Sequence, residues 1–219
     1  MKAGKSRAPL LTTSLARRSL LLGGAATLLL PSRQAWAGAQ REEPLIDSIR
    51  SALSASIAQA APPRPRFDDT EARMAYLRWL GATSERLKKR KTETQIRIEF
   101  LETVWYESKR AGLEPSLVLG LIQVESGFRK YAISTAGARG YMQVMPFWTR
   151  LIGEKHHNLF ALRTNLRYGC VILRYYLDRE QGDYFRALGR YNGSLGQADY
   201  PNLVHGAWKG SWKYDGATS

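Results

Sequence analysis

One carboxylate in the sequence occupies a position where the hydrophobic pattern calls for an apolar residue. Val118, Ile122 and Glu125 are spaced i, i+4 and i+7, which places them on one face of a helix that begins at Pro115. Gly127 would end this helix, so Glu125 would lie in its last turn. Loss of water and the negative end of the helix dipole both raise the pKa of a carboxyl group there. A carboxylic acid that keeps its proton near neutral pH can act as a general acid, although a solvated helix end is the simpler interpretation.

The loop that follows this helix offers groups that could contact a bulky ligand. Ser134, Gly137 and Gly140 are small and would let a ligand approach the backbone closely. Gln143 offers both a hydrogen-bond donor and an acceptor. Met145 and its aromatic neighbours would supply an apolar wall or belong to the core.

Helical periodicity and helix-ending residues predict an all-α fold. The sequence contains no internal repeat and no convincing strand-like alternation. A charged start at Asp68, a proline at 115 and glycines at 112 and 127 are typical helix boundaries. The expected helices span approximately residues 68–80, 96–110, 115–126, 163–178, 184–189 and 202–209.

These motifs resemble those of the soluble lytic transglycosylase family, whose catalytic domain has a goose-lysozyme-like helical fold. The resemblance covers about residues 94–192 and keeps the order and spacing of the family's motifs. It rests on Glu125-Ser126, Ser134, the run GARGYMQVMP and Tyr191-Asn192-Gly193. It implies an all-α, lysozyme-like (goose-type) domain preceded by an N-terminal helical arm.

The resemblance also implies roles for individual residues. Glu125 would be the single acid/base, which protonates the β-1,4 bond between N-acetylmuramic acid and N-acetylglucosamine. The sugar's own C6 hydroxyl would then attack C1 and leave a 1,6-anhydromuramoyl end. Tyr141 and Arg139 depart from the residues common in the family and would alter contacts with the saccharide. The implied substrate-binding residues are Ser134, Gln143, Met145, Tyr191 and Asn192.

Two other functions remain compatible with the sequence. A muramidase of the same fold would use the same glutamate but add water to the bond. The alternative that is not an enzyme is a catalytically idle module that binds the cell wall or assists the assembly of an envelope complex. The intact Glu125, Gln143 and Tyr191-Asn192 argue against the idle module, because binding alone does not require a buried acid.

No metal site and no cofactor are predicted. His156 and His157 are adjacent in the sequence and His205 is distant, so no spacing typical of metal ligands is present. Acids outside the motifs are assigned to surfaces and helix caps. They include Glu154, Asp178, Asp183 and Asp199.

The N-terminal residues have the layout of a cleaved export signal. Residues 1–37 combine a basic start, the apolar run LLLGGAATLLL and the small-residue site Ala35-Trp36-Ala37. The apolar run is too short for a stable membrane span, so the mature chain is expected to have none; an uncleaved anchor is the alternative. Arg17-Arg18 also fits the twin-arginine route, and the sequence does not decide between that and general secretion. Residues 38–66 are expected to be a poorly ordered linker, and residues 67–219 the helical domain.

Net charge and cysteine content narrow the class of partner. The chain has a net charge of +14, and removal of the six basic residues in 1–37 lowers it to +8. A moderately basic exported protein is attracted to polyanionic surfaces such as the bacterial wall. The family resemblance implies that its partner there is the glycan strands of peptidoglycan. No nucleic-acid recognition motif is present. The single cysteine, Cys170, lies in an apolar helical pattern and is expected to be a buried hydrophobe.

Overall fold

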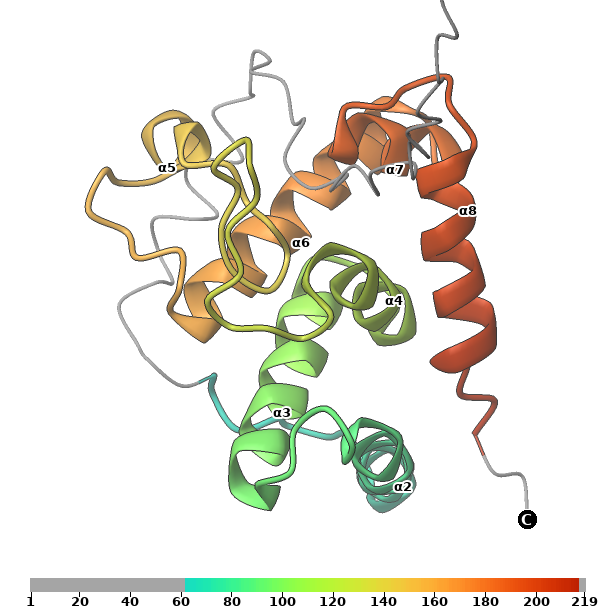
Figure 1. Cartoon of the computed structure of the whole chain (residues 1–219). Helices are drawn as coiled ribbons and strands as arrows, with labels where there is room; N and C mark the ends of the chain where they lie inside the picture. Colours follow the sequence, from blue (N-terminus) through green and yellow to red (C-terminus); the bar gives the residue numbers. More distant parts are fainter. Residues whose placement is uncertain (1–61, 217–219) are drawn as a thin grey trace, which may run out of the picture. The chain divides into compact units, whose positions relative to one another are not determined.

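The computed structural model describes residues 62–216 (Figure 1). The predicted signal segment 1–37 and most of the predicted linker 38–66 lie outside these residues. Within 62–216, no helix combines the length and the apolar character that a membrane crossing requires.

The described residues form helices joined by loops. They contain no strand, only isolated β-bridges that pair Ile133 with Arg139 and Arg139 with Val144. The all-α prediction is therefore confirmed. The α-helices are α2 (Thr70–Leu87), α3 (Thr94–Arg110), α4 (Pro115–Ser126), α5 (Phe147–Ile152), α6 (Leu162–Arg179), α7 (Tyr184–Asn192) and α8 (Asp199–Gly206), followed by a π-helical turn η1 (Ala207–Ser211).

Helix α4 lies at the centre of the core. Its residues from 115 to 122 are all buried, as expected for a helix that is apolar on nearly every side. It packs against α3, α8 and η1, and Figure 1 shows α8 running beside it. Gly120 permits the contact between α4 and η1, since a Cβ there would lie 2.8 Å from the backbone nitrogen of Trp208. Trp212 then donates from Nε1 to Gln123 Oε1 at 2.9 Å, which holds the C-terminal segment against α4.

A buried ion cluster joins α3 to α6. The carboxylate of Glu107 accepts hydrogen bonds from both Arg163 and Arg167. Arg163 Nε lies 3.1 Å and Arg167 Nη2 lies 2.7 Å from Glu107 Oε1. None of the three side chains is more than 7% exposed. A charge buried this deeply depends on its partners, because the surrounding protein replaces water poorly.

Cys170 lies in α6 and is buried, as the sequence predicted. Burial raises the pKa of its thiol, with the negative charge of Glu107 adding to the effect. A thiol held in its neutral form is a weak nucleophile, which agrees with a packing role for this residue.

Replacement of Glu107 tests the buried cluster. The variant Glu107→Gln should lower the free energy of unfolding by about 3–5 kcal/mol, because it leaves two buried guanidinium groups without their counter-charge. Urea denaturation measures this loss. The matched control is Asp178→Asn, which removes an exposed i, i+4 partner of Arg174 on α6 and should cost less than about 1 kcal/mol. Equal losses in the two variants would contradict the role assigned to the cluster.

Candidate active site

Glu125 lies in the last turn of α4 with its carboxyl group buried. Gly127 ends the helix in the left-handed conformation, with φ of 57°. Glu125 is only 8% exposed. Burial raises the pKa of its carboxyl group from 4.5 to about 8. The group is therefore mostly protonated at neutral pH, as the helical spacing predicted.

Tyr200 is the side chain that contacts this carboxyl group. It lies in the first turn of α8, is fully buried, and donates from Oη to Glu125 Oε1 at 2.5 Å. This hydrogen bond partly offsets the effect of burial by lowering the pKa of Glu125. Burial and the neighbouring Glu125 in turn raise the pKa of Tyr200 well above its usual value, so the phenol stays protonated. The sequence analysis missed Tyr200, and no local pattern in a tail of glycine, tyrosine and tryptophan could have paired it with Glu125.

The loop after α4 is held by hydrogen bonds from surrounding helices to its backbone. Ser126 Oγ donates to the carbonyl of Tyr141 at 2.7 Å. Tyr191 Oη donates to the carbonyl of Met142 at 2.8 Å. The Met142 backbone N–H donates to Asn165 Oδ1 at 2.8 Å. Helices α4, α6 and α7 thus fix the same short stretch of backbone.

Gln143 and Ser134 shape the loop from within. Gln143 is buried, adopts a positive φ of 48°, and donates from Nε2 to the carbonyls of Ala132 and Gly140 at 3.1 and 2.9 Å. Ser134 Oγ accepts from the backbone N–H of Ala138 at 3.0 Å. Both polar side chains therefore bind the loop's own backbone. Such bonds let the loop keep an irregular path without leaving backbone groups unsatisfied.

Asn192 and Met145 complete the predicted set. Asn192 is buried in the last turn of α7, and Gly193 ends that helix in the left-handed conformation. Met145 is half-buried and packs against the core. Glu125 accepts a hydrogen bond from Tyr200, and Ser134, Gln143 and Tyr191 form hydrogen bonds with loop backbone.

The two residues that differ from those common in the family, Tyr141 and Arg139, lie in different environments. Tyr141 is buried, with its ring centroid 4.9 Å from that of Phe100 and its hydroxyl accepting from Lys91 Nζ at 2.8 Å. It is a core residue, so any effect on contacts with the saccharide would be indirect, through the packing of the loop. Arg139 is exposed, with its guanidinium over the ring of Phe160.

A cavity of about 390 Å³ lies at the other end of α4. Aromatic residues of α2 and α3 line it together with Pro115 and Ser116. Ser116 precedes Glu125 by nine residues, which corresponds to about 13 Å along a helix. The cavity is therefore separate from the buried acid.

The fold and the site together define an all-α protein with one protonated carboxylic acid held in its core beside a tyrosine. Residues 102–202 match the family described as Transglycosylase SLT domain. The family that this stretch matches is the one that the sequence motifs resemble, so the predicted resemblance is confirmed.

The chain is also similar to curated relatives and to a solved structure. The chain is 35% identical over 103 residues to a "Transglycosylase" of Enterobacteria phage PRD1, which is 47% of this chain and 38% of the phage protein. It is 52% identical over 48 residues to "Membrane-bound lytic murein transglycosylase C" of Actinobacillus pleuropneumoniae, or 22% of this chain and 13% of that protein. An inactive mutant of the lytic transglycosylase Slt from Pseudomonas aeruginosa is similar in structure, with a TM-score of 0.39 and 23% identity over 65% of this chain and 26% of that chain. The chain thus matches well under half the length of these relatives.

The raised pKa of Glu125 predicts a stability change that depends on pH. The folded protein holds the proton up to about pH 8, whereas the unfolded chain releases it near pH 4.5. Because only the unfolded chain releases this proton between pH 4.5 and 8, burial of Glu125 lowers the free energy of unfolding there. This loss is nearly absent below pH 4.5 and grows as the pH rises towards 8. Glu125→Gln removes the titration and should stabilise the protein by about 3 kcal/mol at pH 7 and by less than about 0.5 kcal/mol at pH 4.

Urea unfolding of both proteins at the two pH values measures this difference. The exposed Glu99→Gln on α3 serves as the control and should leave stability nearly unchanged at either pH. A stability difference between Glu125→Gln and the parent that does not change between pH 4 and pH 7 would contradict the raised pKa of Glu125.

Proposed function

We propose that this chain is an exported peptidoglycan lytic transglycosylase. It cleaves the β-1,4 bond between N-acetylmuramic acid and N-acetylglucosamine and leaves 1,6-anhydromuramoyl ends. The observation that supports this most directly is the buried, protonated Glu125 bonded to Tyr200 within an SLT domain. A group that carries a proton at neutral pH can deliver it to a leaving oxygen.

The reaction needs only one carboxyl group. Glu125 donates its proton to the glycosidic oxygen as the bond from C1 to that oxygen breaks. The N-acetyl carbonyl of the muramic acid stabilises C1, and the Glu125 carboxylate then takes the proton of the C6 hydroxyl. O6 bonds to C1, so Glu125 regains a proton and no water is consumed. A nucleophile within the same sugar has an effective molarity that can reach about 10⁵ M or more.

Tyr200 supports both halves of this cycle. Its hydroxyl bonds to Glu125 Oε1, so it holds the carboxyl group in one orientation before proton transfer. After transfer, the same bond stabilises the carboxylate, because hydrogen bonds to charged acceptors are stronger than those to neutral ones. Tyr200 thereby limits how far burial raises the pKa of Glu125.

The substrate-binding assignments follow the family motifs. Ser134, Gln143 and Tyr191 act mainly by fixing the loop backbone, which then presents its own N–H and C=O groups to the glycan. Met145 and Asn192 lie next to these residues in sequence and supply apolar and amide contacts. Peptidoglycan glycan strands are the substrate, and no bound cofactor takes part.

The envelope is the proposed location. Residues 1–37 act as a cleaved signal, 38–66 as a linker and 67–219 as the catalytic domain. The +8 charge that remains after cleavage favours the polyanionic wall. Protein partners in an envelope complex are compatible with this location.

Hydrolysis by a muramidase is the second candidate, since it uses the same acid. Products separate the two reactions: purified peptidoglycan digested with the chain from residue 38 onwards should yield anhydromuramoyl ends, whose mass is one water lower than that of reducing ends. Glu125→Gln should lose at least about 10³-fold of this activity while it still binds the glycan, because it keeps the shape and removes the proton. Glu99→Gln is the matched control and should digest at the parent rate. Lysis by Glu125→Gln at the parent rate would exclude Glu125 as the acid, and reducing ends would assign the chain as a muramidase.

The pH dependence of the rate tests the role of Tyr200. For the parent, kcat/KM should be constant near neutrality and fall above about pH 8, because Glu125 must be protonated to act. Tyr200→Phe removes the bond that lowers the pKa of Glu125, so the alkaline decline should move up by about one pH unit as the maximal rate falls. A lower rate with an unshifted decline would limit Tyr200 to a packing role.

A further inference from the structure

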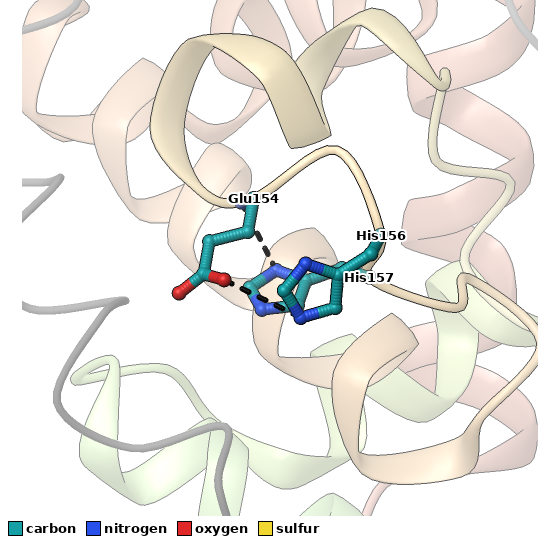
Figure 2. A group of neighbouring side chains, drawn as sticks. All are labelled: Glu154, His156 and His157. Atoms are coloured by element: carbon teal, nitrogen blue, oxygen red, sulfur yellow. Dashed lines mark hydrogen bonds and ion pairs between the residues drawn. The ribbon is translucent and has the colours of Figure 1, made fainter.

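The loop between α5 and α6 brings together three side chains that commonly bind metal ions. Glu154, His156 and His157 each offer one ligand atom, and these atoms all lie within 4.8 Å of one another (Figure 2). Figure 2 shows the carboxylate and both imidazole rings on the same side of the loop. The sequence analysis rejected a metal site because the two histidines are adjacent, yet the loop turns both rings towards the same carboxylate.

The distances suit a small divalent ion. A tetrahedral zinc ion with bonds of about 2.0–2.1 Å separates its ligand atoms by about 3.3 Å. Glu154 Oε2 already lies 3.3 Å from His156 Nε2. His157 needs an approach of about 1.5 Å at most, which is within the reach of side-chain rotation in a loop. One carboxylate and two imidazoles form a donor set that zinc favours.

A buried hydroxyl orients His157. Its Nδ1 lies 2.6 Å from Oη of Tyr168, a fully buried residue of α6. With Nδ1 protonated and donating to that oxygen, Nε2 is left free to bind a metal. The Glu154 backbone N–H also approaches Nδ1, at 3.3 Å, and this longer contact is given up in that tautomer.

The backbone makes room for this pair. A Cβ at Gly153 would lie 1.6 Å from the Tyr168 hydroxyl and 2.9 Å from His157 Nδ1. The glycine therefore allows the imidazole and the phenol to pack directly under the loop.

We propose that Glu154, His156 and His157 form a binding site for a divalent transition-metal ion of the zinc class, with water completing its coordination. The ion would cross-link Glu154, His156 and His157 within the loop 153–161 and so hold the loop in one turn. That loop is joined to the loop near Glu125 through Asn165, whose Nδ2 donates to the carbonyls of Leu159 and Arg139 at 2.9 and 2.8 Å. The site stabilises the support of the active-site loop and takes no part in bond cleavage.

Calorimetry with zinc chloride tests this site in protein without a histidine tag, after removal of metal by a chelator. The parent should bind one ion per chain with a dissociation constant below about 10 μM. His156→Ala and His157→Ala should each weaken binding at least 10-fold. His205→Ala is the matched control, because it removes the remaining histidine, which lies on α8, and should bind zinc as the parent does.

Tyr168→Phe distinguishes a site whose ligand is oriented by the protein core from nonspecific binding of metal by exposed side chains. It keeps the buried ring and removes the oxygen that orients His157, so zinc affinity should fall about 10-fold. Zinc should also raise the thermal midpoint of the parent and leave that of His157→Ala unchanged. The proposal is overturned if the parent shows no saturable binding below 100 μM, or if the His156 and His157 variants bind as tightly as the parent.

Discussion

The site depends on one buried hydrogen bond, from the Tyr200 hydroxyl to the Glu125 carboxyl group. Burial of an acid costs free energy unless it keeps its proton and finds a polar partner. Both conditions hold because α8 packs against α4, and Gly120 lets the following turn η1 approach α4 closely at Trp208. The fold thus keeps a buried carboxylic acid in its neutral form at neutral pH, although burial of this group lowers the free energy of unfolding.

The motif residues around this bond act largely through the backbone. Ser126 donates to the carbonyl of Tyr141, and Tyr191 and Asn165 bond to the backbone of Met142. Gln143 donates to carbonyls of its own loop. A loop fixed in this way presents its N–H and C=O groups at defined positions without the entropy cost of ordering long side chains. This explains why several polar residues of a proposed carbohydrate site are buried and bonded internally.

Asn165 also connects the loop near Glu125 to the loop between α5 and α6. One side chain bonds to the loop near Glu125, at Met142 and Arg139, and to the following loop, at Leu159. The loop that carries Glu154, His156 and His157 is therefore joined through Asn165 to the loop near Glu125. The Glu107 cluster adds a second link, since it holds the helix that carries Asn165 against α3.

The sequence by itself determined most of the helices and the position of the buried acid, because both follow from contacts within one or two helical turns; it missed the short α5 and ended α2 too early. The i, i+4, i+7 spacing placed Glu125 on the apolar face of α4, and periodicity located α3, α6 and α7 to within a few residues. Only the tertiary structure decided that Tyr200 is its partner, 75 residues away in the chain. It also decided that Tyr141 points into the core and that two adjacent histidines turn towards one carboxylate. Local spacing specifies which face a side chain occupies, whereas packing between distant helices and the path of a loop specify what that face meets.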